Sequence, residues 1–372
     1  MALKAFTFDG PLMELFVGLG YDLYRDDPAW VPPLRAEVWR QLSASFPFYA
    51  RPRNDHRRFL ALSDGRPLAR CLASVNRDLV DGDGEPIGAI GFFEAADDYP
   101  ASEDVLAGAV RWLREEHGLR RIWGPMNFDI WHGYRFMTRG FERDRFLGEP
   151  CNRPSYPETF ERFGFVALKQ WNTFELDGAL QRLEDDDGWR RRAERGYRLE
   201  PFDLGRFDSS VEALHWVLTR SFSSFVGYTP ISLPDFRGLM SVARHAVRPE
   251  CSVFVYDEKG ALAGFTTVFS DLAQAVRAMA GSSSPLAKLR FLRACRRRRR
   301  LMIHLGGITP EESAKHNGIA AAAFGQVAIR VRAQRAESVL ATLVARGNPV
   351  RRLYGEYALD RRREYTLYEL AS

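Results

Sequence analysis

The sequence predicts an α/β fold with two similar halves, each a mixed, mostly antiparallel sheet flanked by helices. Its 372 residues are enough for two domains, and 45% are hydrophobic against 27% charged, which is a globular balance. Helical and strand-like periodicities follow in the same order in both halves. The halves also end alike, with NRPSYPETFERFGFVALKQWNTFEL in the first and NPVRRLYGEYALDRRREYTLYEL in the second, which indicates a duplicated domain.

The first half opens with helices and continues with a hairpin. Apolar residues at helical spacing predict helices over 11–24, 34–43, 104–117 and 156–163. Alternating or apolar runs predict strands over 58–63, 67–76, 88–95, 122–128 and 166–176. Asp64-Gly65 is a strong hairpin signal between the first two strands, and Gly118 stands where a left-handed helix cap is expected.

The second half repeats this order. Its predicted helices cover 209–222, 233–246, 285–299, 318–334 and 349–357. Its predicted strands cover 252–256, 262–270, 301–308, 338–345 and 364–370. The stretch 184–195 is acidic, then basic, and has no apolar periodicity, so we expect it to link a domain over 1–180 to a domain over 195–372.

Composition narrows the class of protein. The four cysteines stand far apart with no C-x-x-C pair, so we expect neither a disulfide framework nor a thiolate zinc site. No apolar run approaches the ~18 residues of a membrane-spanning helix, and the N-terminus does not read as a signal peptide. The expected location is the cytoplasm. Residues 281–372 hold 18 basic and 7 acidic side chains, which predicts an anionic partner near the C-terminal part.

Several segments of both halves resemble one family. They are DPAWVPPL, GFFEAADD, GPMNFD, RGF (139–141) and SYPETFERFGF in the first half, and YTPIS, SDLAQA and GGITP in the second. With these segments the chain resembles the bacterial tandem-GNAT acyltransferases, a broad group that includes bacterial ceramide synthases. The resemblance implies two tandem GNAT domains and an N-acyltransferase. Its acyl donor would be acyl-coenzyme A or an acyl-carrier protein, and its acceptor would be an amine. The most specific acceptor that the resemblance implies is a lipid-like sphingoid amine.

The resemblance also implies a loop that holds the pyrophosphate of coenzyme A, at the start of a helix after the fourth strand. Free N–H groups and the helix dipole favour a polyanion there. The second half reads K-x-x-G-x-A from Lys315 to Ala320, with alanine in place of the family's second glycine. The matching region of the first half has Glu94, Asp97 and Asp98 and no glycine, so we expect one carrier site. The predicted carrier residues are Gly307, Ile308, Thr309, Lys315, His316, Asn317, Gly318, Ile319, Ala320 and Asn348.

Acyl transfer to an amine needs a proton acceptor and a donor for the departing thiolate. By resemblance, the acid is a tyrosine on the short helix after the fifth strand, which Tyr354 matches, with Tyr357 as the alternative. The candidate bases are Asp271, Glu337 and His304, and a water relay is the alternative to all three. Neither a Ser-His-Asp triad nor metal-ligand spacing is present, so no metal is expected.

Two further segments invite an interpretation. Trp131, His132 and Tyr134, with Phe225 and Tyr228, predict an apolar acceptor pocket between the domains, or else ordinary inter-domain packing. Residues 286–300 combine an apolar stripe with many arginines. This pattern predicts contact either with an anionic membrane, which would place the protein peripherally at the inner face of the membrane, or with an acidic carrier protein. The alternative is a helix face that is simply exposed to solvent. Nucleic acid is not expected, because no aromatic platform accompanies the run.

The leading hypothesis is therefore an acyl-CoA-dependent N-acyltransferase. A ligand-binding or scaffold protein with a decayed GNAT site is the first alternative, because the carrier loop departs from the family's pattern. An aminoacyl-tRNA-dependent aminoacyltransferase, which also pairs two such domains, is the second, and its binding to transfer RNA would weaken steeply with salt.

Overall fold

The computed structural model describes residues 1–176, 180, 196–295, 300–315, 318–354 and 362–371, without the side chains of Val242, Leu353 and Tyr354. The predicted linker 184–195 and the alternative acid Tyr357 lie outside the described residues. So do His316 and Asn317 of the predicted carrier loop.

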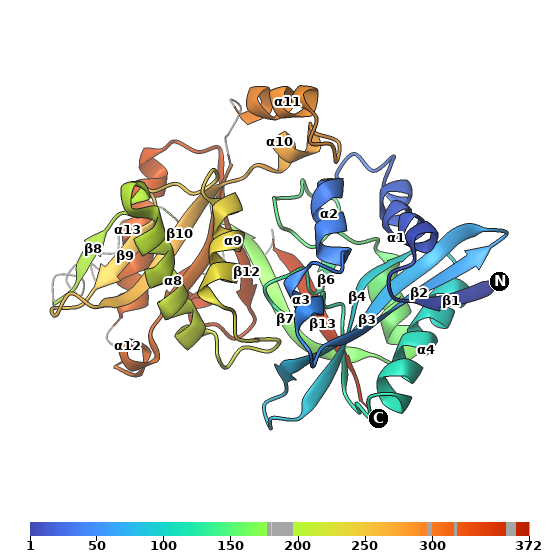
Figure 1. Cartoon of the computed structure of the whole chain (residues 1–372). Coiled ribbons are helices and arrows are strands. Elements are labelled where there is room, and N and C mark those ends of the chain that lie inside the picture. Colours follow the sequence, from blue (N-terminus) through green and yellow to red (C-terminus); the bar gives the residue numbers. More distant parts are fainter. Residues whose placement is uncertain (177–179, 181–195, 296–299, 316–317, 355–361, 372) are drawn as a thin grey trace.

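Thirteen strands of the described residues form one hydrogen-bonded sheet that runs through both halves (Figure 1). The strands of the first half are β1 (Ala2–Phe6), β2 (Asp55–Ser63), β3 (Arg66–Val80), β4 (Pro86–Ala95), β5 (Ile122–Gly124), β6 (Phe136–Arg139) and β7 (Val166–Glu175). Those of the second half are β8 (Arg198–Glu200), β9 (Val253–Tyr256), β10 (Leu262–Ser270), β11 (Arg300–Ile308), β12 (Ser338–Ala345) and β13 (Arg363–Leu370). The order in the sheet is β1-β2-β3-β4-β5-β13-β7-β12-β11-β10-β9-β8, and β6 pairs with β13 beside this path.

Helices cover both faces of the sheet (Figure 1). In the first half, α1 (Gly10–Leu23), α2 (Arg35–Leu42) and α3 (Pro47–Ala50) lie on one face, and α4 (Tyr99–Glu115) and α5 (Ser155–Phe163) on the other. In the second half, α8 (Phe207–Ser221) and α9 (Leu233–Ala243) lie opposite α13 (Ile319–Ala333). The short helices are α10 (Ala273–Arg277), α12 (Pro310–Ala314) and α14 (Arg351–Tyr354), and α11 (Pro285–Cys295) stands with α10 at one edge of the molecule.

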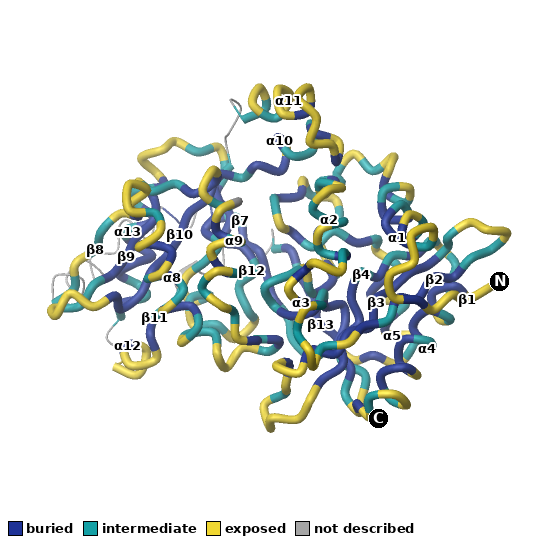
Figure 2. The backbone as a smooth tube through the Cα atoms, viewed as in Figure 1, coloured by how far each residue is buried: buried dark blue, intermediate teal, exposed yellow. Residues whose placement is uncertain are grey.

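Most strand residues are buried, as Figure 2 shows. Their apolar side chains pack between the sheet and each helical layer. The apolar stripe of α4, with Val105, Leu106 and Leu113, packs on β2, β3 and β4. In the second half, Val327 and Val331 of α13 pack on β10 to β12 in the same way. Each half thus has its own core, as expected for two domains of a mixed α/β fold.

The last strands of the two halves are exchanged within the sheet. The C-terminal strand β13 pairs antiparallel with β5 and β7, so the end of the chain completes the sheet of the first half. Strand β7 in turn pairs with β12, the last strand of the second half before β13. The sequence predicts a closing strand for each half at these places, and the structure places each one between two strands of the other half. The division of the chain at 180 and 195 stays a prediction.

A buried ion pair fixes β13 where it meets the first half. Arg363, at the start of β13, places Nε 3.4 Å from Oε1 of Glu149, and its side chain is 2% exposed and that of Glu149 0%. Tyr365, two residues along β13, donates its hydroxyl to the same carboxylate. Arg363 also donates to the carbonyl oxygen of Asp144 at 3.1 Å. Burial raises the pKa of Glu149, although Arg363 and Tyr365 stabilise its charged form.

Each half contains one pair of parallel strands that separates along its length. Strands β4 and β5 pair only at Gly88–Ala89 and 122–123, and β11 and β12 only from Arg300 to Ile303. Because β5, β13, β7 and β12 pair antiparallel in this order, the two parallel pairs point in opposite directions along the sheet. The openings, where the strands of each pair separate, therefore lie at opposite ends of the strands in the sheet.

A second junction joins the two halves through loops. Ile130 donates its backbone N–H to the carbonyl oxygen of Gly227 at 3.1 Å, and Trp131 donates Nε1–H to that of Thr229 at 2.8 Å. Thr229 donates its hydroxyl to Asp129 at 3.0 Å. The loop after β5 is thereby held against the loop after α8.

Replacing Gly227 with alanine is expected to loosen this junction. Gly227 has φ +85°, and a Cβ there would lie 2.6 Å from Cε of Met126 and 2.7 Å from Cγ2 of Ile130. The strained backbone and the crowding together should lower the free energy of unfolding by about 2–4 kcal/mol. Denaturant unfolding measures this, with Gly65→Ala (φ +77°, open space) as the control for backbone strain alone. An equal loss in both variants would show that the crowding contributes nothing.

Most predicted helices and strands are present, and the differences have local causes. Helix α4 begins at Tyr99 instead of 104, because Asp98 accepts a hydrogen bond from the N–H of Ala101 at 3.0 Å and Pro100 suits the first turn. The predicted strand 122–128 ends at Gly124, because Pro125 has no N–H to continue the ladder. Strands β1, β6 and β8 were not predicted; each has five residues or fewer.

Candidate active site

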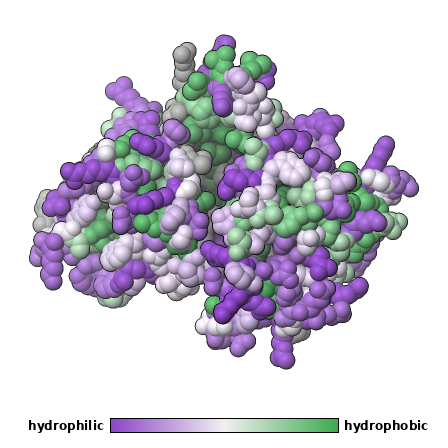
Figure 3. Space-filling model, in the orientation of Figure 1, coloured by the Kyte–Doolittle hydropathy of each residue, from purple (hydrophilic) through white to green (hydrophobic). Residues whose placement is uncertain are grey.

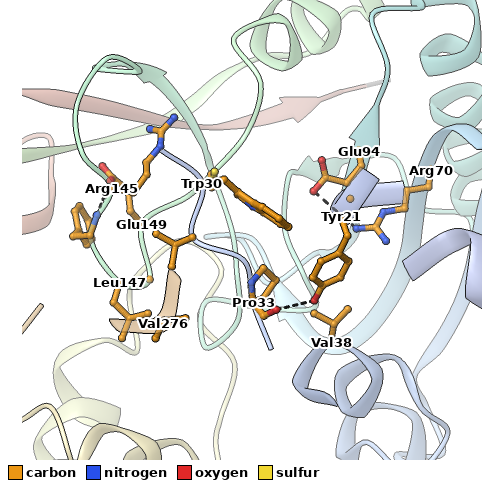
Figure 4. A pocket seen from close by; sticks show the side chains of 15 residues that line it. Tyr21, Trp30, Pro33, Val38, Arg70, Glu94, Arg145, Leu147, Glu149 and Val276 are labelled. Atoms are coloured by element: carbon orange, nitrogen blue, oxygen red, sulfur yellow. Dashed lines mark hydrogen bonds and ion pairs between the residues drawn. The ribbon is translucent and has the colours of Figure 1, made fainter. Parts of the chain in front are cut away.

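A cavity of about 380 Å³ lies at the carboxyl end of β4, between the two halves. Residues from α1, α2 and the segment 30–33 form one wall, and the segment 145–151 with Val276 of α10 forms the other (Figure 4). The lining residues are Gly20, Tyr21, Trp30, Val31, Pro33, Val38, Arg70, Glu94, Arg145, Phe146, Leu147, Gly148, Glu149, Cys151 and Val276. The cavity is thus largely apolar, with a few charged groups, as small-molecule sites usually are.

Two charged side chains face the cavity from adjacent strands. Arg70 of β3 and Glu94 of β4 come in from the same side in Figure 4, with NH2 of Arg70 3.9 Å from Oε1 of Glu94. Their side chains are 7% and 18% exposed. Tyr156 of α5 donates its hydroxyl to Oε2 of Glu94 at 2.9 Å. Burial raises the pKa of Glu94, and the Arg70 guanidinium opposes that shift. The site therefore holds a carboxylate whose proton affinity is higher than usual.

Arg70 itself is held by the backbone of α1. One terminal nitrogen donates to the carbonyl oxygen of Phe16, and its guanidinium lies 4.8 Å from the centre of the Phe16 ring. Its Nε has no hydrogen-bond partner among the described residues. A buried guanidinium with an unmade hydrogen bond beside a carboxylate is costly to keep, and such costs are concentrated at binding sites.

The second half forms hydrogen bonds with the segment 29–35, which is part of the cavity wall. Arg277 of α10 donates to the carbonyl oxygen of Trp30 from Nε at 3.1 Å, and to that of Ala29 at 2.9 Å. The N–H of Arg35 donates to the carbonyl oxygen of Gly281 at 3.0 Å, and Tyr21 donates its hydroxyl to that of Pro33 at 2.8 Å. Both halves therefore fix the position of the Trp30 ring, which stacks on Tyr24 with a centroid distance of 5.5 Å.

In the second half, His304 stands where β11 leaves β12. The pairing of the two strands ends at Ile303, and Nδ1 of His304 lies 2.7 Å from Oγ1 of Thr342. Thr342 donates its hydroxyl to the carbonyl oxygen of Ile303 at 3.2 Å, so Nδ1 carries the ring proton and Nε2 keeps its lone pair. Burial lowers the pKa of His304 to about 4, and Arg135 adds to this shift. His304 is therefore a neutral and weak base at pH 7.

The predicted carrier loop precedes α13 at the open end of β11. Gly318 takes φ +78° at the start of α13, a conformation that glycine adopts without strain. Lys315, the basic residue of the loop, donates to Glu312 at 2.6 Å, so its charge is already paired inside the chain. The N–H of Thr309 donates to the carbonyl oxygen of Ala263 at 2.9 Å.

No protein-family model matches the sequence. Two curated relatives are similar over three quarters of the chain: protein YghO of Escherichia coli K12 (22% identical over 290 residues, 75% of this chain and 71% of the relative) and the bacterial ceramide synthase of Caulobacter vibrioides (24% over 295 residues, 75% and 73%). The tandem GNAT protein from the clavulanic acid biosynthesis pathway matches 100% of this chain and 98% of its own, with a TM-score of 0.52 and 13% identity. The chain has the tandem GNAT fold. A probable N-acyltransferase from Enterococcus faecalis V583 matches with a TM-score of 0.53 and 10% identity, over 100% of this chain and 73% of that one.

Two of the three candidate bases, Asp271 and Glu337, lie away from the opening between β11 and β12 or are held by structural contacts. Asp271 accepts from the N–H groups of Leu147 and Ala273, both at 2.9 Å, and from Arg300 at 2.7 Å, so its carboxylate ties β10 to the first half. Glu337 precedes β12, at the end opposite to the opening, because parallel strands separate here at their carboxyl ends. His304 alone of the three stands at the opening.

Most of the remaining predicted carrier and catalytic residues make hydrogen bonds or helix contacts within the second half. Asn348 accepts from the N–H of Val350 at 3.0 Å and so shapes the turn before α14. Tyr354 ends α14, and its side chain lies outside the described residues. The register of β11 against β10 shifts at His304, while Gly306 and Gly307 pair regularly with Thr266 and Phe265. Ile308 accepts from Ser221 at 2.7 Å, and Ile319 and Ala320 begin α13.

The predicted acceptor residues lie at the junction between the halves. Trp131 packs edge-on against Tyr228 at 5.9 Å, and His132 places Nδ1 2.7 Å from Asp129. Tyr134 packs edge-on against Trp171 within the first half, and Phe225 is 45% exposed and stacks on Phe222. Of these contacts, the one between Trp131 and Tyr228 joins the two halves, and an acceptor role for the five residues stays a prediction.

Sequence reasoning missed Arg70 and Tyr156 and used Glu94 only as a charge that repels phosphate. A signal was present, because Arg70 interrupts the apolar run 67–73 of β3 and Glu94 stands near the end of β4. A charge in a buried strand needs a partner, but the sequence does not say which one. Among the described residues, no group of His, Cys, Asp and Glu is arranged to hold a metal ion.

Proposed function

We propose that the protein is an N-acyltransferase that transfers an acyl group from a thioester to a primary amine with an apolar chain. The observation that carries the proposal is the cavity at the end of β4, which has the partly buried carboxylate Glu94 beside Arg70 on one side, Arg145 and Glu149 on the other, and mostly apolar side chains between them. The tandem GNAT fold supports acyl transfer as the reaction class. The similarity to the bacterial ceramide synthase of Caulobacter vibrioides supports a lipid-like amine as the acceptor.

Glu94 has the properties of the proton acceptor. An amine attacks a thioester carbonyl only in its neutral form, so its proton must go to a base. A carboxylate with a raised pKa serves better than an exposed one, because its proton affinity is closer to that of the working solution. The neighbouring hydroxyl of Tyr156, 2.9 Å from the carboxylate, orients Glu94, and the proton that Glu94 takes from the amine is passed on to the sulfur of the departing thiolate. Trp30, Val38 and Val276 would border the apolar chain of the acceptor.

The thioester has to approach within about 3–3.5 Å of the amine nitrogen, which sets where the donor binds. The start of α4 is unfavourable for a pyrophosphate, because Asp98 already caps the helix and Asp97 pairs with Arg153. This favours a donor held largely by its acyl and pantetheine parts, as acyl-coenzyme A or on an acyl-carrier protein. The second-half loop at Gly318, with His304 as base, is the alternative centre, supported by the uncommitted Nε2 of His304.

Binding of a long-chain acyl-coenzyme A, measured by calorimetry, distinguishes the two centres. If the second half holds the carrier, Gly318→Glu should weaken binding at least 100-fold, because a carboxylate and a strained backbone replace the glycine at the start of α13. If the donor binds in the first half, Gly318→Glu should leave binding unchanged. Gly347→Glu, also at a positive φ (+95°) but outside the loop, is the matched control. A wild-type protein that binds neither acyl-coenzyme A nor acylated carrier protein would contradict the acyltransferase proposal.

A further inference from the structure

Helix α11 presents an apolar face with no protein partner among the described residues. Leu286, Leu289 and Leu292 are 57%, 54% and 62% exposed, which places them among the most exposed large apolar side chains. Ala287 is buried on the opposite side, and Phe291 packs on the core beneath. At about 100° per residue, the three leucines span an arc of about 120° on the outer side of the helix. Leaving such an apolar face exposed to water is unfavourable, so we expect a binding partner to cover it.

The cations of α11 border this face. Lys288 and Arg290 are exposed and stand about 40° beyond either end of the leucine arc. Arg293, in the last turn, is exposed as well; it lies within the leucine arc, about 20° from Leu286, and its stem is long enough to carry its charge past the leucines. The helix contains no acidic residue. An apolar face with positive margins is complementary to a surface that is apolar inside and anionic outside.

The place of α11 favours a flat partner over a groove-binding one. Figure 1 shows α11 at the apex of the molecule, standing away from the sheet. Figure 2 shows that most of it is exposed, and Figure 3 shows hydrophobic beside hydrophilic side chains at this apex. A projecting helix of 11 residues, about 16 Å long, can lie in the plane of a bilayer surface without the rest of the protein interfering. No helix of the described residues is long and apolar enough to cross a membrane, so this contact would be peripheral.

We infer that α11 docks the protein on an anionic phospholipid bilayer. The three leucines enter the boundary between headgroups and acyl chains, and Lys288, Arg290 and Arg293 meet lipid phosphates. Helix α10, which packs on α11, carries Val276 into the cavity wall and is clipped to the segment 29–30 by Arg277. A docked α11 therefore holds the cavity beside the membrane. The inference does not rest on the proposed acyl transfer, since it follows from the exposed face and its charges.

Co-sedimentation with vesicles tests the inference without any substrate. The full chain should sediment with vesicles of phosphatidylcholine mixed with phosphatidylglycerol, less so as salt rises, and should stay in solution with phosphatidylcholine alone. K288E/R290E/R293E should lower the partition coefficient on the order of 100-fold, because each of the three cations contributes roughly fivefold near an anionic surface. L286S/L289S/L292S should lower it at least 10-fold, because the apolar contact is lost.

The matched control is R53E/R66E/R120E, which changes the net charge equally at exposed arginines far from α11 in sequence and should cost less than 10-fold. Circular dichroism establishes that all three variants remain folded. The inference is overturned if the wild type ignores anionic vesicles, or if the control loses as much binding as the α11 variants. It is also overturned if α11 binds an acidic carrier protein and no vesicles, which would identify a protein partner instead.

Discussion

Replacing Arg363 with methionine is expected to lower the free energy of unfolding by about 3–5 kcal/mol. Methionine keeps the apolar stem and removes the guanidinium, so Glu149 is left as a buried carboxylate without its cation. The carbonyl oxygen of Asp144 loses its donor in the same variant. Because these contacts hold β13 against the first half, the effect should appear in the cooperative unfolding of the chain and not only at its C-terminus. Denaturant unfolding followed by tryptophan fluorescence measures it.

The neighbouring residue supplies the control. Arg362→Met removes a side chain that is 31% exposed and pairs with Glu364 at 2.6 Å, so it should cost less than about 1 kcal/mol. The double variant E149Q/R363M should be more stable than Arg363→Met, since the unpaired charge is gone. Equal losses from Arg362→Met and Arg363→Met would mean that the buried pair has no special weight.

The cost of Arg363→Met should depend on pH, with a sign fixed by Glu149. Burial already raises the folded pKa of Glu149 above its usual 4.5, and losing Arg363 should raise it further. A carboxyl with a raised folded pKa binds its proton more tightly in the folded state, so the stability of the fold falls as pH rises from about 4.5 through the folded pKa. The destabilisation should therefore be larger at pH 8 than at pH 5. A constant difference across this range would contradict the assignment of the effect to Glu149.

The position of β13 shows where prediction from sequence stops. The strand itself was predicted, because its alternation of buried and exposed residues is a local property. Its neighbours were not, because alternation does not identify the strand across the ladder. Strand β7 has suitable residues along both edges and pairs with β12 and β13 at once. Only tertiary contacts, such as that between Arg363 and Glu149, select this arrangement.

Turn and cap signals were more informative, because their chemistry is local. Asp64 and Gly65 both take positive φ, 48° and 77°, at the predicted hairpin. Gly118 takes φ +66° after α4, as predicted. The start of α4 was placed five residues late, although Asp98 followed by Pro100 is a recognisable helix start. Reading that pair would also have explained the acidic loop, since one of its carboxylates serves as a cap.

The candidate active site was the hardest part to predict. Its charged residues come from two strands, and its walls come from segments that are more than 100 residues apart, such as Trp30 and Val276. A resemblance to GNAT proteins directs attention to a glycine loop, and that loop lies in the other half. The cavity wall is complete only because α10 packs on the first half through Arg277, a contact that the sequence does not predict.

Replacing Glu94 with glutamine is expected to lower kcat/KM for acyl transfer by about 10²- to 10⁴-fold, the usual contribution of a positioned general base. Glutamine keeps the size and can still accept from Tyr156, so the cavity should keep its shape. Acceptor-amine binding should fall much less than the rate, because the apolar wall remains. The assay is transfer from a long-chain acyl-coenzyme A or acyl-carrier protein to a long-chain primary amine, followed by release of the thiol.

The pH profile separates a base from a merely structural carboxylate. In the wild type, kcat/KM should rise with pH through the raised pKa of Glu94, because only the ionised carboxylate accepts a proton. That limb should disappear in Glu94→Gln. Glu161→Gln is the matched control, since Glu161 also accepts from a tyrosine, Tyr368 at 3.0 Å, but lies outside the cavity. If Glu94→Gln keeps full activity while His304→Gln loses it, the reacting centre lies in the second half, and the cavity at β4 serves binding alone.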